Sequence, residues 1–230
     1  FAPTAKIIQI DIDPTSIHKN IEVHCPIVGD CKAALEGILH LMEDQKTDDL
    51  KNNRPQWLDQ IEEWKSTTPL KYNQGSEVIK PQFVVEKLYE LTKGDAIITT
   101  EVGQNQMWAA QYYHFNKPNH FITSGGLGTM GFGLPAAIGA KAACPDKLVV
   151  DVAGDGSIQM NIQELMTAVE SKIDVKIVIL NNQYLGMVRQ WQELFYEKVY
   201  SFTDMENTPD FVKLAEAYGA KGLRCTRPDE

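Results

Sequence analysis

The sequence predicts an α/β protein: a doubly wound parallel sheet, preceded by the tail of a second α/β domain. From residue 83 onward, short apolar runs of strand length alternate with helical patterns, which indicates a parallel sheet covered on both faces. A polar stretch with three prolines separates this region from an earlier strand-and-helix pattern. We therefore expect the end of a first domain over residues 1–42, a connection over 43–82 and the main domain over 83–230.

The first domain contributes two short strands and a helix. Residues 6–12 (KIIQIDI) have the β-branched composition of a strand, which Asp13-Pro14 closes. The apolar pair Ile27-Val28 leads into Gly29-Asp30, and a helix is expected from Cys31 because apolar residues then recur at helical spacing. Those positions are Leu35, Ile38, Leu39 and Met42, and a modest helix within the connection carries Trp57, Ile61 and Trp64.

In the main domain the elements alternate regularly. A helix that starts near residue 83 ends at Gly94, since glycine readily ends helices. The expected strands are residues 96–102, 120–123, 148–153 and 175–180; the expected helices lie around 107–112, at 134–143, and from the turn after residue 153 to about residue 170.

The composition is that of a globular protein with a formal net charge of −9 and no basic run. This charge repels nucleic acid and anionic membranes, so neither is an expected partner. The longest apolar runs are too short to span a membrane. Four separated cysteines without a CxxC pair indicate reduced thiols and a cytoplasmic-type compartment. Because the chain starts without Met and stops abruptly, we expect it to be cut from a longer polypeptide.

A glycine-flanked aspartate directly follows the strand at 148–153 and precedes Ser157. Gly154 and Gly156 let the backbone approach a ligand closely, and the helix expected after them offers N–H groups and a dipole that favour phosphate. Asp155 supplies the negative oxygen that a hard divalent cation needs beside a phosphate. Taken alone, Gly-Asp-Gly is most often a plain turn, so the combination with two other segments carries the prediction.

Those segments lie at the ends of two other strands. Asn181-Asn182 follows the strand after Asp155, and right-handed crossover brings the carboxyl ends of both strands to one edge, where Asp155 and Asn182 can share a cation. A carboxylate, an amide oxygen, a backbone carbonyl and two phosphate oxygens suit magnesium. The glycines of residues 125–133 imply close packing against a ligand, and Met130 offers an adaptable apolar surface to a ring.

The order Gly-Asp-Gly, helix, strand, Asn-Asn, with residues 157–180 between, resembles the thiamine-diphosphate enzyme signature. Other stretches narrow the resemblance, over essentially the whole chain, to the acetolactate synthase (acetohydroxyacid synthase) catalytic subunit. They are residues 102–110 (VGQNQMWAA), 124–131 (SGGLGTMG) and 185–192 (LGMVRQWQ). The resemblance implies an enzyme of branched-chain amino acid biosynthesis. It would decarboxylate pyruvate on thiamine diphosphate and transfer the hydroxyethyl unit to a second 2-keto acid, pyruvate or 2-ketobutyrate.

The same resemblance assigns residues to the site. Asp155, Asn182 and the backbone carbonyl of Tyr184 would ligate magnesium. Met130 would lie beneath the thiazolium ring, and the Gly128 carbonyl would accept a hydrogen bond from the aminopyrimidine. The residues expected to hold the diphosphate are Gln104, Gly154, Gly156 and Ser157. Trp191 would line the substrate pocket and favour 2-ketobutyrate, with Met187 and Val188 packed nearby, and Met187 is also expected to contact the cofactor.

The pair Gln190-Trp191 resembles the anabolic branch of the family, which contains a structural FAD. FAD would lie on the first domain, where Asp11, Ile12 and the Gly29-Asp30 turn match.

The resemblance also implies a homodimer or homotetramer, a small regulatory subunit, and a catalytic Glu supplied by the N-terminal domain of a neighbouring subunit. This chain alone would then lack carboligase activity. Asn105 departs from the His of many relatives.

Other functions stay open. Pyruvate oxidase or glyoxylate carboligase would share Asp155 and Asn182, but not the run at 187–191. A non-catalytic domain that binds a nucleotide or FAD would bind thiamine diphosphate without requiring magnesium. A NAD-dependent Rossmann oxidoreductase is disfavoured, because no GxGxxG follows the first strand of a βαβ unit. Glu101, at a strand end, suits helix capping or solvent contact as well as catalysis.

Overall fold

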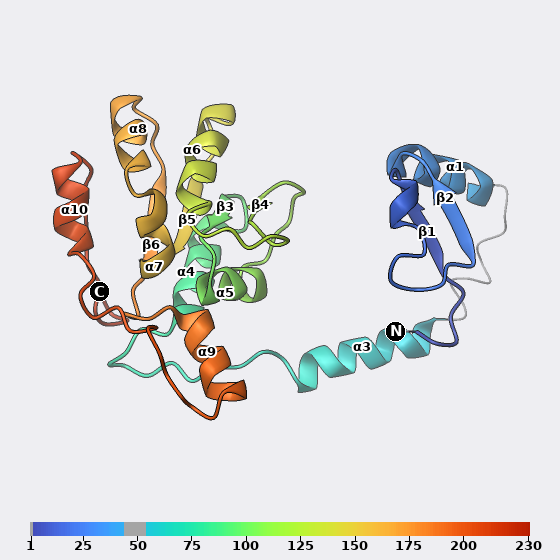
Figure 1. Ribbon diagram of the computed structural model, residues 1–230, viewed down its shortest axis with the longest axis horizontal. Coiled ribbons are helices and arrows are strands. Elements are labelled where there is room, and N and C mark those ends of the chain that lie inside the picture. The colour runs from blue at the N-terminus through green and yellow to red at the C-terminus, as the bar shows by residue number, and fades with distance from the viewer. Residues whose placement is uncertain (1, 44–53) are drawn as a thin grey trace. The chain divides into compact units, whose positions relative to one another are not determined.

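The computed structural model describes residues 2–43 and 54–230 (Figure 1). The chain divides into two compact units, Phe1–Pro69 and Leu70–Glu230, and each is described by itself. Residues 44–53 of the predicted connection lie outside the described residues. The predicted domain boundaries after residues 42 and 82 stay predictions. Within the described part of the chain, no helix has the length and apolar character needed to cross a membrane.

The first unit contains the two strands and the helix expected from its sequence. Its strands pair in parallel, with Asp11 opposite Val28, and the Asp13 side chain caps a short 3-10 helix by accepting from the Thr15 N–H (2.8 Å). A further helix starts at a proline, which is well placed in a first helical turn. The elements are β1 (Ile8–Asp11), η1 (Pro14–Ser16), β2 (Cys25–Val28), α1 (Cys31–Glu43) and α3 (Pro55–Thr67).

The second unit is built on a four-stranded parallel sheet, which confirms the predicted fold class. The spatial order is β4-β3-β5-β6. After β3 the chain winds to one side to form β4 and then returns to the other side to form β5 and β6. The strands are β3 (Ile97–Thr100), β4 (Phe121–Ile122), β5 (Val149–Gly154) and β6 (Lys176–Leu180).

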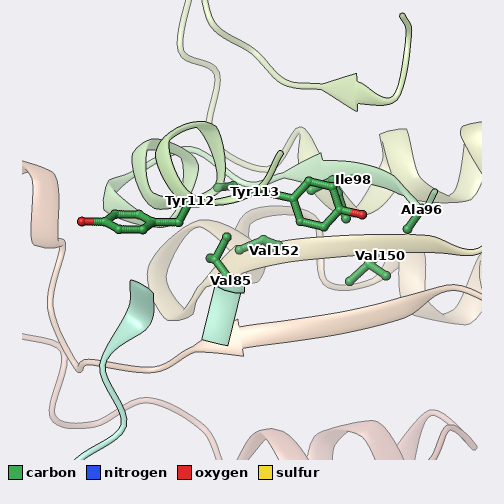
Figure 2. Close-up of a cluster of buried hydrophobic side chains, with 8 residues drawn as sticks. Val85, Ala96, Ile98, Tyr112, Tyr113, Val150 and Val152 are labelled. Atoms are coloured by element: carbon green, nitrogen blue, oxygen red, sulfur yellow. The ribbon is translucent and has the colours of Figure 1, made fainter. Parts of the chain in front are cut away.

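Helices cover both faces of this sheet because successive side chains of each strand point to opposite faces. Val150 and Val152 of β5 pack with Ile98 of β3 against α4 and α5, as Figure 2 shows. Val149 and Ala153, which alternate with them, face α6 and α8. The helices of this unit are α4 (Pro81–Thr92), α5 (Gln104–Tyr112), α6 (Gly133–Ala143), α7 (Asp155–Ile158), η2 (Gln159–Asn161), α8 (Glu164–Glu170), α9 (Gly186–Phe195) and α10 (Phe211–Ala217).

The single helix predicted from the turn after residue 153 to about residue 170 is wrong. The segment is divided into α7, η2 and α8, and α7 has only four residues. Within this segment the Asn161 side chain donates to the carbonyl of Gly131 (2.8 Å). The helix-dipole argument for phosphate therefore applies only weakly here.

Candidate functional site

The sheet reverses its winding between β3 and β5, and ligands of open α/β sheets bind outside the carboxyl ends of strands at such a point. Glu101 directly follows β3, and Asp155 directly follows β5. The end of β6 is level with the end of β5, because Gly154 pairs with Leu180. The segments that carry the predicted metal and diphosphate residues therefore reach the same edge.

Asp155 is buried, with only 1% of its surface exposed. Burial raises the pKa of its carboxyl above the ordinary value, and nearby main-chain N–H groups, including those of Gln183 and Asn182, oppose the rise. These groups place the carboxyl against the segment that follows β6. Within the described part of the chain, its Oδ2 atom has no hydrogen-bond partner. A buried oxygen without a partner is costly, and a cation would satisfy it.

A short antiparallel pairing fixes the loop after β6. The Asn182 Oδ1 atom accepts a hydrogen bond from the N–H of Tyr184 (3.1 Å), and Tyr184 pairs with Asp204. Main-chain hydrogen bonds from Leu185 to Thr203 (2.9 Å) and from Met205 to Gln183 (2.8 Å) hold the same pairing. The structure thus brings Asp155, Asn182 and Tyr184 to one corner, and their ligation of a metal stays a prediction.

The residues of this corner fit magnesium better than a metal held by protein alone. One carboxylate, one amide and one carbonyl leave room for phosphate oxygens, which is how magnesium is usually held at phosphate sites. Among the residues that the structure describes, no group of three or more His, Cys, Asp or Glu side chains could hold a metal ion. The orphaned oxygen of Asp155 is the observation that supports the fit.

Two glycines allow α9 and its loop to pack closely against the corner. A Cβ atom at Gly156 would lie 2.7 Å from Leu185 Cδ2, and a Cβ atom at Gly186 would collide with the Gln104 side chain. Gln104 begins α5, and its Nε2 atom donates to Gln190 Oε1 of α9 (2.9 Å). The close packing leaves the Gln104 side chain between α5 and α9, where the sequence predicts a diphosphate contact.

The glycine-rich loop is exposed at its tip and buried at its base. Leu127 is 92% exposed, and Gly128 has a φ of +71°, a conformation that favours glycine. The Thr129 N–H donates to Ser124 Oγ (3.0 Å). Met130 is half-buried, and the next residue, Gly131, is fully buried. The roles predicted for the Gly128 carbonyl and the Met130 side chain stay predictions.

An open apolar hollow of about 770 Å³ lies along α9. The rings of Trp191 and Phe195 meet edge to face at 5.4 Å between centroids. Trp191 is 53% exposed, so much of its ring can contact a ligand. The hollow brings together the three residues predicted to lie near the substrate, and its lining includes Met187, Val188, Trp191, Gln192, Phe195 and Val199.

Family models match both parts of the chain. Residues 101–230 match the model described as thiamine pyrophosphate enzyme, C-terminal TPP binding domain. This chain belongs to the thiamine pyrophosphate enzymes. Residues 1–38 match the model of the central domain of the same enzymes. The family membership expected from the Gly-Asp-Gly and Asn-Asn segments is therefore confirmed.

Individual thiamine pyrophosphate enzymes show a narrower similarity. The chain is 53% identical over 230 residues to the acetolactate synthase isozyme 3 large subunit of Escherichia coli K12, and 52% identical to the acetolactate synthase large subunit of Haemophilus influenzae. It is 47% identical over 237 residues to acetolactate synthase 1, chloroplastic, of Nicotiana tabacum. Each alignment covers all of this chain but only 40%, 40% and 35% of the relative. The chain thus spans about two fifths of the length of these relatives.

The Ser157 hydroxyl of this thiamine pyrophosphate enzyme is bonded within the protein, and the predicted contact of Ser157 with a diphosphate stays a prediction. The hydroxyl is buried, donates to Glu101 Oε2 (2.5 Å) and accepts from the N–H groups of Gly131 (3.1 Å) and Val102 (3.2 Å). Only the main chain of Ser157 is then free to serve the predicted contact. Glu101, for which the sequence left helix capping, solvent contact and catalysis open, is fully buried and accepts from the N–H of Leu134 in the first turn of α6 (3.0 Å).

Asn105 is a second residue whose place the sequence did not indicate. Its side chain is buried and donates to the carbonyls of Glu101 and Val152 (2.8 Å each). It therefore ties the end of β3 to the end of β5 at the point where the sheet reverses. The only sequence signal was its departure from the His of many relatives, and that signal did not reveal the contact.

Proposed function

We propose that the complete protein is an acetolactate synthase catalytic subunit. It would decarboxylate pyruvate and join the two-carbon unit to a second 2-keto acid in branched-chain amino acid biosynthesis. Large subunits of that name in two bacteria are 53% and 52% identical over this whole chain. The structural observation that carries the proposal is the buried, unpartnered Oδ2 atom of Asp155 at the end of β5. It suits magnesium bound to a diphosphate.

The cofactor, when bound, supplies the nucleophile and the electron sink that decarboxylation of a 2-keto acid requires. In the proposal, Asp155, Asn182 and the Tyr184 carbonyl hold magnesium, which in turn holds the diphosphate. Met130 and the Gly128 carbonyl contact the two rings. The main-chain atoms of Gly154, Gly156 and Ser157, with the Gln104 side chain, hold the diphosphate oxygens.

Helix α9 carries the residues that we propose contact the substrate. The edge-to-face pair of Trp191 and Phe195 presents an apolar wall, and Met187 extends that wall. An apolar wall excludes water, and it favours an acceptor with an extra methylene by burying it. We therefore propose that Trp191 favours 2-ketobutyrate over pyruvate as acceptor.

The proposed FAD site lies on the first unit. The Gly29 N–H donates to the Asp11 carbonyl (3.0 Å), so the ends of β1 and β2 are joined where Asp11, Ile12 and the Gly29-Asp30 turn are expected to meet FAD. FAD would be structural there. A homodimer or homotetramer, a small regulatory subunit and a cytoplasmic location complete the proposal.

Product analysis of the complete protein tests this function. With pyruvate, thiamine diphosphate and magnesium, we expect acetolactate, and with added 2-ketobutyrate the corresponding mixed product. Acetyl phosphate with peroxide would instead assign the protein to the pyruvate oxidases. Binding of thiamine diphosphate that does not depend on magnesium, measured by calorimetry, would favour a non-catalytic domain.

A further inference from the structure

Glu101 is a fully buried carboxylate that the proposed chemistry does not use. It directly follows β3, where the sheet reverses its winding. Its Oε1 atom accepts from the N–H of Leu134 in the first turn of α6 (3.0 Å), and its Oε2 atom accepts from the N–H of Gly131 (2.9 Å) and the hydroxyl of Ser157 (2.5 Å). Three donors from three segments therefore converge on one side chain.

These contacts connect the two halves of the predicted cofactor site. Gly131 adjoins Met130, the predicted platform for the thiazolium ring, and Ser157 lies in the turn predicted to hold the diphosphate. Both backbone polar groups of Gly131 are held, since its N–H bonds to Glu101 and Ser157 while its carbonyl accepts from Asn161 (2.8 Å). The exposed loop is thus fixed at its base to the diphosphate turn.

The charge of Glu101 is satisfied by neutral donors, because within the described part of the chain no Lys or Arg forms an ion pair with it. Burying a carboxylate in this way is expensive, but no neutral side chain of its size offers two acceptor oxygens. A second acid, Asp151, lies beneath the same loop. Its pKa is raised well above the ordinary value by burial and by the negative charge of Glu101.

We propose that Glu101 is a positioning residue that sets the distance between Met130 and the diphosphate turn, so that both halves of thiamine diphosphate are bound at once. This inference deepens the proposed function and rests on it. Removing the acceptor should loosen the loop that carries Met130 while Asp155, Asn182 and the Tyr184 carbonyl remain in place. Binding of the ring half of the cofactor should then suffer, and binding of the diphosphate half should not.

The test is Glu101→Gln in the complete protein, which keeps the size of the side chain but places an NH₂ group against one of the N–H donors. Calorimetry with magnesium compares thiamine diphosphate with inorganic pyrophosphate. We expect the variant to bind pyrophosphate within about threefold of the native protein and thiamine diphosphate at least about tenfold more weakly, the effect of losing a hydrogen bond to a charged group. Equal loss for both ligands, or for neither, would overturn the inference.

Thr99→Val is the matched control. Thr99 is buried in β3, and the one side-chain hydrogen bond that the structure gives it in the described part of the chain goes to Asp151 (3.1 Å). We expect this variant to lower the melting temperature and to leave the ratio of the two affinities unchanged. A change of that ratio as large as in Glu101→Gln would show that general destabilisation is responsible, and would contradict the positioning role.

Hydrogen exchange of the cofactor-free protein provides a readout that does not depend on the proposed function. In the native protein we expect slow exchange at the amides of Gly131 and Leu134, with at least about tenfold faster exchange in Glu101→Gln. If Glu101→Gln does not fold, Ser157→Ala, which removes one partner of Glu101, should speed exchange at Gly131. Unchanged exchange refutes the inference. If exchange in the native protein is slow as expected but thiamine diphosphate does not bind in a magnesium-dependent way, the proposed function is refuted. Glu101 would then only support the loop.

Discussion

The buried corner around Asp155 and the open hollow along α9 belong to the same unit but are built in opposite ways. In the corner, Asp155, Ser157 and Glu101 are almost fully buried, and main-chain contacts fix the surrounding loops. In the hollow, Trp191 and Phe195 expose more than half of their surface. The difference teaches that the polar residues of the corner are enclosed by the fold, whereas the apolar residues of the hollow are left open on α9. Changes in the corner should therefore act on cofactor binding, and changes in the hollow on substrate choice.

The largest effect is expected for Asp155→Ala. Loss of the buried Asp155 carboxylate should reduce the magnesium-dependent affinity for thiamine diphosphate by at least about 100-fold, because a hard cation depends on charged oxygen. Titration calorimetry of the complete protein measures this loss. Asp174→Ala, which removes an exposed Asp paired with Lys176, should change the affinity by less than about twofold. Similar losses in both variants would contradict a local metal site.

Asn182→Ala should have the next largest effect. The change removes an amide oxygen from the corner and the hydrogen bond that Asn182 accepts from the Tyr184 N–H. We expect an affinity for magnesium and thiamine diphosphate lower by about 10- to 100-fold. Asn181→Ala is the neighbouring control, since Asn181 accepts a comparable hydrogen bond from Gln183. Equal losses from both asparagines would mean that loop shape, and not ligation, is responsible.

Trp191→Leu should leave the corner untouched. We expect the affinity for thiamine diphosphate to stay within about twofold. The preference for 2-ketobutyrate over pyruvate, measured by competition between the two acceptors, should change by about tenfold, the effect of altering a pocket that senses one methylene. If Trp191→Leu weakened cofactor binding as much as Asn182→Ala, the two regions would not be separable in function.

Asp151→Asn should have the smallest effect, and it concerns stability. Burial, followed by the charge of Glu101, raises the pKa of Asp151 in the folded protein, whereas an unfolded Asp titrates near about 3.9. From about that pH up to the folded pKa, the folded state keeps a proton that the unfolded state loses, so native stability falls as the pH rises.

The asparagine variant lacks this fall. The melting temperature of the variant minus that of the native protein should be about 2–4 °C higher at pH 8 than at pH 4. This difference corresponds to a change of about 1 kcal/mol in the free energy of unfolding. Thermal unfolding at both pH values checks the difference. If the melting temperature of Asp151→Asn fell relative to that of the native protein as the pH rises, the assignment of a raised pKa to Asp151 would be refuted.

The sequence predicted the frame of the fold because strand and helix periodicities are local properties. The strand before Gly154 and the strand before Asn181 were placed almost to the residue, and the corner could be inferred from chain topology alone. The roles of the individual residues in that corner stay predictions.

Glu101, Ser157 and Asn161 could not be placed in this way. The hydrogen-bond partners of Glu101 lie 30, 33 and 56 residues away in the chain, and no periodicity reports such contacts. The hydrogen bond from the Asn161 side chain to a carbonyl 30 residues earlier is another contact of this kind. A glutamate at a strand end looks like a solvent-facing residue until its distant donors are known.

The cover over Gly156 has a consequence for synthesis of the protein. Leu185 and Met205 close over this glycine, and the pairing of Tyr184 with Asp204 shapes the metal corner. A ribosome that has released only the sheet and α8 has not yet delivered this lid, although Asp155 emerged much earlier. The cover over Gly156 can therefore form only after residue 205 has left the exit tunnel.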